Sequence, residues 1–305
     1  MTAPAGRKTL VARPRDWMAL AALVAMWGSA FALTSIAVAG MAPVWVAAGR
    51  ITLGAGLLWL VMRATGETLP RERSTWAWFA WLGFIGNVAP FVLISWAQQT
   101  IASSLAGILV ALMPIMVILL ANVLLPDEPL TRRKALSFGC GFIGVVLLVG
   151  PAALGDFSLD GMRIVAELAV LLAAAGYALN AVTARLAPPL PGLVLGAGVL
   201  LAAAPQALLI AVLSSPAPAM PSAATLTAVV LLGVFPTALA TAVLYPLLMR
   251  AGAGFVATSN YYVPCFAVAL GVAFMGESLH AFDYAGFVVI LLGVVIAQTD
   301  GDPAG

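Results

Sequence analysis

Most side chains that could do chemistry in this sequence lie inside long apolar segments. Two of them are ionisable, Arg50 and Glu167. An ionisable group in such a segment is costly unless it is paired or functional, so each is a candidate for a binding or proton-transfer role. Arg50 has the forked donor geometry that binds a carboxylate, although hydrogen bonds to backbone carbonyls would give it a structural role instead. Glu167 follows Arg163 by one helical turn, so this spacing also predicts an ordinary ion pair.

A second group of candidates is uncharged. The octapeptide SNYYVPCF, residues 259–266, places an amide, two phenols and a proline in the middle of an apolar segment. Polar groups at that depth should face protein or a wet cavity, because unsatisfied polar groups are costly in hydrocarbon. We therefore predict a binding cavity lined by Trp27, Ser29, Asn87, Tyr177, Asn180, Tyr245, Asn260, Tyr261 and Tyr262. Hydrogen bonds between helices would also explain the polar members, and a packed core indole would explain Trp27.

Two prolines lie near the middles of apolar segments. Pro264 has no N–H and crowds the carbonyl four residues earlier, so it predicts a helix kink that frees the carbonyl of Asn260. Pro114 predicts the same kind of kink, but the side chains around it are apolar. The kinks therefore indicate shared architecture, and the polar surroundings of Pro264 favour substrate recognition there.

Motifs for enzymatic chemistry are absent from the sequence. The one histidine is His280, no cluster of His, Cys, Asp and Glu has metal-binding spacing, and no nucleophile motif or phosphate-binding glycine loop is present. We predict that the chain is not an enzyme and uses no cofactor or metal. No basic patch interleaved with aromatic residues suggests nucleic-acid binding either.

The elements that must position these residues are helices in a membrane. Of the 305 residues, 63% are hydrophobic and 9% are charged, far from the composition of a soluble domain. A membrane span needs about 20 apolar residues. On that basis we predict an all-α polytopic membrane protein with ten spans, at residues 17–39, 43–62, 75–96, 101–124, 135–150, 164–184, 190–213, 224–248, 253–275 and 282–298.

The positive charges predict how the spans are oriented. Of the 14 Lys and Arg residues, twelve lie on the side of the amino terminus if the spans alternate, Arg163 lies opposite, and Arg50 lies within a span. Positively charged loops are retained in the cytoplasm. Both termini are therefore predicted to be cytoplasmic in a multi-pass protein of the cell inner membrane.

The two halves of the chain repeat each other. Glu128, Leu130, Phe138, Gly144, Val145 and Val146 recur 149 residues later as Glu277, Leu279, Phe287, Gly293, Val294 and Val295. Each half holds five spans, an odd number, so the second copy must be inverted. We predict a cytoplasmic tail at 1–16, a first repeat at 17–150, an external loop at 151–163, a second repeat at 164–298 and a tail at 299–305. Glu128 and Glu277 each precede a span, where a carboxylate favours the positive end of that helix.

These motifs resemble a known family. The Trp27-Gly28 pair, PVWVAAGRITLGAGLL in the second span, a proline followed by PDEPLT, and a proline followed by MGESL are similar to the EamA-type transporters of the drug/metabolite transporter superfamily. The resemblance covers essentially the whole chain. It implies ten helices around a central cavity and export of small metabolites, with amino acids a frequent class. The seventh span has no counterpart of Arg50, so the two copies are not functionally identical.

Together these observations predict a secondary transporter that exports small metabolites by alternating access. Amino acids are the favoured substrate class. Lipophilic or cationic drugs and other metabolites are alternative substrates, and a structural membrane protein or membrane enzyme is the alternative class. The predicted partners are the substrate and the lipid bilayer. If transport is coupled to H+, Glu167 is the candidate proton site. The sequence does not distinguish a monomer from a dimer.

Overall fold

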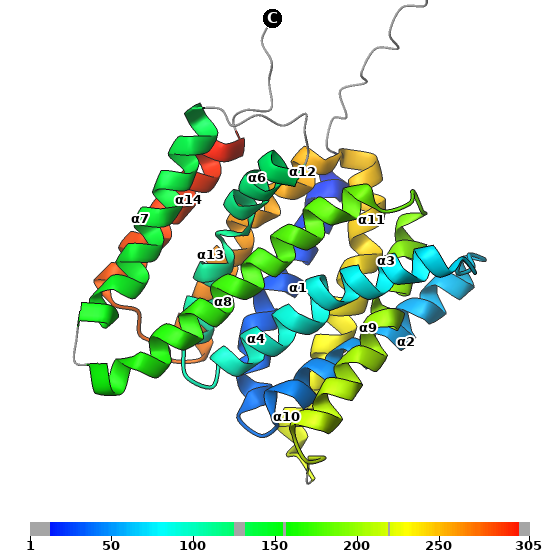
Figure 1. The fold of residues 1–305 in the computed structure, drawn as a ribbon, viewed down its shortest axis with the longest axis horizontal. Coiled ribbons are helices and arrows are strands. Elements are labelled where there is room, and N and C mark those ends of the chain that lie inside the picture. Colours follow the sequence, from blue (N-terminus) through cyan, green and yellow to red (C-terminus); the bar gives the residue numbers. More distant parts are fainter. Residues whose placement is uncertain (1–12, 125–131, 155–156, 219, 299–305) are drawn as a thin grey trace, which may run out of the picture.

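The structure is a computed structural model that describes residues 13–124, 132–154, 157–218 and 220–298 (Figure 1). Every regular element in these ranges is a helix. The first half contains α1 (Pro14–Val38), α2 (Pro43–Ala64), α3 (Arg73–Gly83), the π-helix η1 (Phe84–Val88), α4 (Ala89–Ala97), α5 (Ser103–Val110), α6 (Met113–Leu124) and α7 (Arg132–Leu154). The second half contains α8 (Phe157–Thr183), the short 3₁₀-helix η2 (Ala184–Leu186), α9 (Gly192–Ser214), α10 (Ala223–Leu232), the π-helix η3 (Gly233–Leu239), α11 (Ala240–Ala251), α12 (Ala253–Ala257), α13 (Ser259–Phe274) and α14 (Ala281–Gln298).

These helices fall on the predicted spans. Eight helical segments of the described chain are long and apolar enough to cross a membrane, and two shorter apolar helices, Ala135–Leu147 and Ala281–Ile296, occupy the fifth and tenth predicted spans. The predicted loop at 151–163 is shorter than expected, because α7 continues to Leu154 and α8 begins at Phe157. Ala152, Ala153 and Leu154 favour helix at the end of α7.

Two bundles form the body of the fold. In the first, α8 packs against α4, η1, α5 and α6; in the second, α1 packs against α10, η3, α11 and α13. Each bundle thus combines the first span of one half with the third and fourth spans of the other half. The pairs α2–α9 and α7–α14 join equivalent spans of the two halves, and α7 and α14 lie side by side at the left edge of Figure 1.

The two bundles touch unequally on the two faces of the molecule. Where α5 begins, α5 packs against α13 and α1, and α1 also packs against α4. Gly107 brings α5 so close to α13 that an added Cβ would lie 2.7 Å from the Cβ of Ala267. Toward the opposite face, in the part of the chain that the structure describes, α8 has no comparable packing against α11 or α12. The bundles therefore close together on one face and diverge toward the other.

Two π-helices, which the sequence did not predict, interrupt the third and eighth spans at equivalent places. η3 begins at Gly233, 149 residues after η1 begins at Phe84, the same spacing as the sequence repeat. Pro236 lies inside η3 and has no N–H to donate to the carbonyl of Leu232. Wide turns of this kind are frequent at functional sites.

The fourth and ninth spans are broken near the predicted prolines. In the fourth span, α5 ends at Val110 and α6 begins at Met113, so that Pro114 lies in the first turn of a new helix, a position that tolerates proline. In the ninth span the interruption is at Thr258, one and a half turns before Pro264, and α13 runs without a break through Pro264. The Thr258 hydroxyl donates to the Phe255 carbonyl at 2.6 Å and helps to end α12 there.

Candidate functional site

A cavity of about 430 Å³ lies between the two bundles. Its wall is built by α1, α2, the third span, both parts of the fourth span, α8, the eighth span and α13. The scaffold pair α7–α14 and the helix α9 contribute none of the described lining residues. Most of the lining is apolar or aromatic, with a few polar groups, which is the usual composition of a small-molecule site.

Eight of the residues singled out from the sequence lie on this wall. They are Trp27, Arg50, Asn87, Pro114, Tyr177, Asn180, Asn260 and Pro264. They come from six separate spans, and only the folded arrangement of the bundles brings them together. Asn87 and Asn260 make no side-chain hydrogen bond within the described part of the chain, so their amides are available to a ligand.

Three other predicted residues lie away from this cavity. Ser29 donates to the carbonyl of Met26 in its own helix, at 3.1 Å. Tyr245 packs its ring against Gly192 and Gly196 of α9. Tyr262 is 49% exposed on the outer surface of α13. The side chain of Tyr261 lies outside the described residues.

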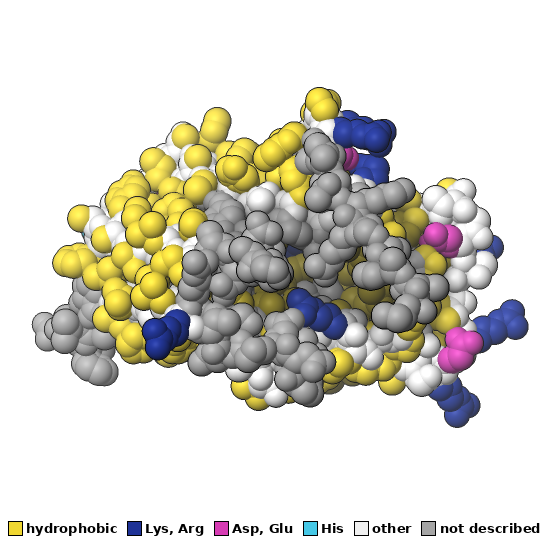
Figure 2. All heavy atoms as spheres, turned by 90° about the horizontal axis from the view of Figure 1, so that it is seen from above, with side chains coloured by type: hydrophobic (Ala, Val, Ile, Leu, Met, Phe, Trp, Pro, Cys, Tyr) yellow, Lys and Arg dark blue, Asp and Glu magenta, His cyan; other side chains and the backbone are white. Residues whose placement is uncertain are grey.

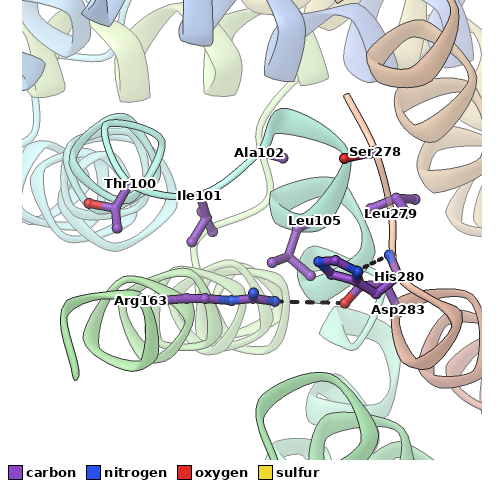
Figure 3. A pocket seen from close by; sticks show the side chains of 9 residues that line it. All are labelled: Thr100, Ile101, Ala102, Leu105, Arg163, Ser278, Leu279, His280 and Asp283. Carbon is purple, nitrogen blue, oxygen red and sulfur yellow. Dashed lines mark hydrogen bonds and ion pairs between the residues drawn. The ribbon is translucent and has the colours of Figure 1, made fainter. Parts of the chain in front are cut away.

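Glu167 also lies away from the cavity. Its side chain is fully buried, and the predicted ion pair is present, with Arg163 Nε 2.9 Å from Glu167 Oε1. Arg163 also approaches Asp283, with Nη2 3.8 Å from Oδ1. Figure 3 shows Arg163 and Asp283 on the wall of a separate small pocket of about 120 Å³, beside His280. The Asp283 carboxylate also accepts the backbone N–H of His280 at 2.8 Å and so caps the start of α14.

The sequence analysis missed two aromatic residues of the cavity wall. Phe31 and Phe91 line the cavity beside Trp27 and Tyr177, and the Phe91 and Tyr177 rings meet edge to face with centroids 6.4 Å apart. Nothing in the sequence separates these two phenylalanines from those that face lipid. They are apolar residues in apolar helices, and only the packing of the bundles distinguishes them.

Arg50 is held in the cavity wall by two neutral groups. Its guanidinium carbon lies 3.6 Å from the centroid of the Phe91 ring, which is a cation–π contact. Its Nε and Nη2 each donate to the Thr237 hydroxyl at 3.3 Å. The same hydroxyl donates to the Leu232 carbonyl at 2.8 Å. Pro236, four residues after Leu232, has no N–H to donate to that carbonyl. The π-helix η3 thus positions Thr237, and Thr237 positions Arg50.

Asn180 has a related role in the first bundle. Its Nδ2 donates to the carbonyl of Leu82 at 3.0 Å, directly before η1. Gly86 lies under this amide, and an added Cβ there would overlap Nδ2. Asn180 therefore holds the wide turn of the third span against α8, and it is also one of the residues that line the cavity.

Glu277 ties the two bundles together on the closed face. Its Oε1 accepts hydrogen bonds from the Ser103 N–H and hydroxyl, both at 2.7 Å, and its Oε2 accepts from the Ser104 N–H at 2.9 Å. Glu277 therefore caps the start of α5 and not, as we predicted, that of α14, because the folded chain places the loop after α13 over α5. Glu128, its repeat counterpart, lies outside the described residues.

This capping changes the acidity of Glu277. Partial burial raises the pKa of the carboxyl group, but the hydrogen bonds from Ser104 and Ser103 outweigh burial and hold the pKa below its ordinary value of 4.5. The carboxylate is therefore the stable form of this group at neutral pH.

The opposite face is the one toward which the bundles diverge. Figure 2 shows this face from above, with a recess near its middle in which hydrophobic side chains are visible and with Lys and Arg side chains around it. The ends of α1, η2 and α11 that carry Arg15, Arg185 and Arg250 lie on this side (Figure 1). Arg250 bonds to Asp16 at 3.1 Å and joins α11 to α1 within the second bundle.

Comparisons with known proteins agree with this architecture. A solved crystal structure is 22% identical and superposes with a TM-score of 0.65 over 94% of this chain and 97% of that chain, which shows the fold alone. A relative from Archaeoglobus fulgidus described as an uncharacterized transporter is 30% identical over 142 residues. That alignment covers 45% of this chain and 49% of the relative, so the chain spans about half the length of the relative it matches.

The family comparison extends over both halves. The sequence profile of the EamA-like transporter family matches residues 16–150 and again residues 164–299. These two matches cover most of the chain. The protein is a multi-pass membrane protein, and it belongs to the EamA-like transporter family.

Proposed function

We propose that this protein is a secondary transporter that exports small metabolites through the cavity between its two bundles, with amino acids as the favoured substrate class. One observation carries the proposal: a cavity of about 430 Å³ is lined by spans from both halves of the chain. Sites between structural repeats, beside interrupted helices, are characteristic of secondary transporters. The interruptions at Ala111–Leu112 and the π-helices η1 and η3 supply such helices here.

The unequal packing of the bundles supports alternating access. The bundles meet where α5 begins and diverge toward the face that carries Arg15, Arg185 and Arg250. The bias of Lys and Arg toward that side supports a cytoplasmic location for this face and for both termini. The proposed topology is ten spans arranged as two inverted five-helix repeats. In this orientation the structure is the inward-facing state in the inner membrane, ready to load a solute for export.

The chemistry of the cavity favours amino acids over the alternative substrates. Its wall offers one guanidinium, a few amides and hydroxyls, and a largely aromatic and aliphatic surface. No carboxylate stands among the described lining residues to neutralise a cationic drug. Coupling to H+ at Glu167 remains a prediction, and the buried pair with Arg163 is the feature such coupling would use.

Counterflow in sealed proteoliposomes tests this function. Purified protein is reconstituted with a high internal concentration of one unlabelled solute, and uptake of the same labelled solute is followed for amino acids, nucleosides and cationic drugs in turn. We expect transient accumulation of labelled amino acids above equilibrium, because only a carrier exchanges solute in this way. Uptake equal to that of protein-free liposomes for every solute would contradict the proposal.

A further inference from the structure

The cavity carries an unbalanced charge. Among the lining residues that the structure describes, Arg50 is the only charged side chain. It is 6% exposed, and a guanidinium in a protein stays protonated. A buried charge without a counter-ion is strongly disfavoured. The described part of the chain places no carboxylate within ion-pair distance of Arg50, so the natural counter-ion is one that arrives from outside the protein.

The neutral partners of Arg50 leave part of its donor set open. Thr237 accepts from Nε and Nη2, whereas Nη1 makes no hydrogen bond within the described residues. The Phe91 ring covers one face of the guanidinium plane and limits its rotation. A guanidinium held in this way presents its remaining N–H groups as a fork, the geometry that matches the two oxygens of a carboxylate.

The other lining residues indicate the chemistry of the rest of the ligand, beyond its carboxylate. Trp27, Phe31, Tyr177 and Leu244 offer apolar and aromatic surface. The side-chain amides of Asn87 and Asn260, which have no partner in the described part of the chain, supply oxygens that can accept hydrogen bonds from an ammonium group. Such a wall fits a small molecule with one carboxylate and an apolar body.

We infer that Arg50 binds the carboxylate of the transported solute, which makes small carboxylates with an apolar body, such as α-amino acids with apolar side chains, the substrate class of the cavity. This inference rests on the proposed transport function. Arg50 is the binding group, and Thr237 and Phe91 are positioning residues that hold its fork toward the cavity. The second half has no equivalent arginine, so recognition of the carboxylate is asymmetric between the repeats.

Wild-type protein provides the first test, because it requires no substitution. Counterflow of labelled L-phenylalanine is measured in proteoliposomes while unlabelled L-phenylalanine or L-phenylalaninamide is added as a competitor. We expect the acid to inhibit at a roughly 10-fold lower concentration than the amide, since the amide lacks the charge that pairs with Arg50. Equal inhibition by the acid and the amide would overturn the inference.

Substitutions of Arg50 test whether this residue causes the preference for the acid over the amide. We expect Arg50→Gln to raise the KM for L-phenylalanine by roughly 10- to 100-fold, the loss expected for hydrogen bonds to a charged group, and to abolish the preference for the acid over L-phenylalaninamide as a competitor. Arg50→Lys keeps the positive charge without the forked donor geometry, so its KM for L-phenylalanine should lie between those of the wild type and of Arg50→Gln. The control Arg63→Gln removes a positive charge from the end of the same helix, outside the cavity. It should change neither the KM for L-phenylalanine nor the preference for the acid over the amide.

The outcomes separate this inference from the function on which it rests. If the Arg50→Gln protein prefers the acid as strongly as the wild type does, the role of Arg50 is contradicted, but the proposed transport function is not. If that variant does not fold, the competition experiment on wild-type protein decides alone. A wild-type protein that moves neither the acid nor the amide contradicts the proposed amino-acid transport, and the inference falls with it.

Discussion

Asn180 and Thr237 show how single side chains complete the backbone of a wide helical turn. Thr237 donates a side-chain hydrogen bond to the Leu232 carbonyl directly before η3, and Asn180 donates one to the Leu82 carbonyl just before η1. Both side chains also belong to the cavity wall, so the residues that stabilise the π-helices are the ones that shape the site.

The contact between Gly86 and Asn180 gives a prediction at this scale. A Cβ at position 86 would overlap the Asn180 amide, so Gly86→Ala should displace that amide and destabilise the protein by about 1–3 kcal/mol, the usual cost of overpacking. The measurement is the thermal unfolding midpoint of the purified protein in detergent. Gly56→Ala on α2 is the matched control, because a Cβ there meets nothing within 4 Å. Equal midpoints for the two variants would show that Asn180 is not held as described.

Residue types predicted part of the cavity wall, and the reason for the limit is physical. Polarity inside an apolar segment identified Arg50, Asn87 and Asn260, because such groups seek protein or a wet cavity. The same rule selected Ser29, which satisfies its hydroxyl within its own helix. It could not select Phe91, because hydropathy does not distinguish a phenylalanine that faces a cavity from one that faces lipid.

At the scale of elements, the start of α5 depends on a residue far away in the sequence. Its N-cap, Ala102, offers no side-chain acceptor, and Glu277 supplies three hydrogen bonds from the loop after α13. The backbone N–H of Glu277 also bonds to the Gly271 carbonyl at the end of α13, at 3.1 Å. One carboxylate therefore joins an element of the first bundle to an element of the second.

This arrangement predicts a dependence on pH. Because the pKa of Glu277 is lowered in the folded protein, the stability that it contributes is fully present above the ordinary value of 4.5 and is lost as the pH falls through the lowered value. We expect the unfolding midpoint of the wild type to fall on acidification in this range and that of Glu277→Gln, which starts lower, to fall less. Parallel pH profiles for the two proteins would contradict the capping role.

The sequence indicated the places of the helices better than their interruptions. Length and hydropathy located the eight helical segments that are long and apolar enough to cross a membrane, and two shorter apolar helices, because a membrane fixes how many apolar residues a span requires. The π-helices were not predicted, because proline alone does not specify a π turn and the side chains that bond beside these turns include Asn180, from another helix. The interruption at Thr258 was not predicted, whereas Pro264, where we predicted a kink, lies inside α13.

For the whole molecule, the two halves have similar elements but unequal contacts. The α1 helix reaches both bundles, since it packs against α13 and also against α4 and α5. Its counterpart α8 packs within the first bundle and, among the described residues, has no comparable contact with α11 or α12. Exchanging these two sets of contacts would close the side that carries Arg15, Arg185 and Arg250 and open the other. In the alternating-access cycle that we propose, this exchange gives the second state.

A disulfide across the closed face tests this account most directly. The Cβ of Ser104 on α5 lies 3.1 Å from the position of a Cβ at Gly271 on α13, near the separation of about 3.5–4.5 Å found in disulfides. An added Cβ at Gly271 would also displace the Glu277 carboxylate, an effect that the Gly271→Cys single variant measures by itself. A Ser104→Cys, Gly271→Cys protein, with Cys140 and Cys265 replaced by alanine, should cross-link the two bundles on oxidation. Each single-cysteine variant serves as the control for effects of the oxidant alone.

The decisive measurement is counterflow by this double-cysteine protein before oxidation, after oxidation and after reduction. If the bundles must separate on this face to release solute, oxidation will abolish counterflow in proportion to the cross-linked fraction, and reduction will restore it. Undiminished counterflow by fully cross-linked protein would contradict alternating opening of the cavity between the two bundles.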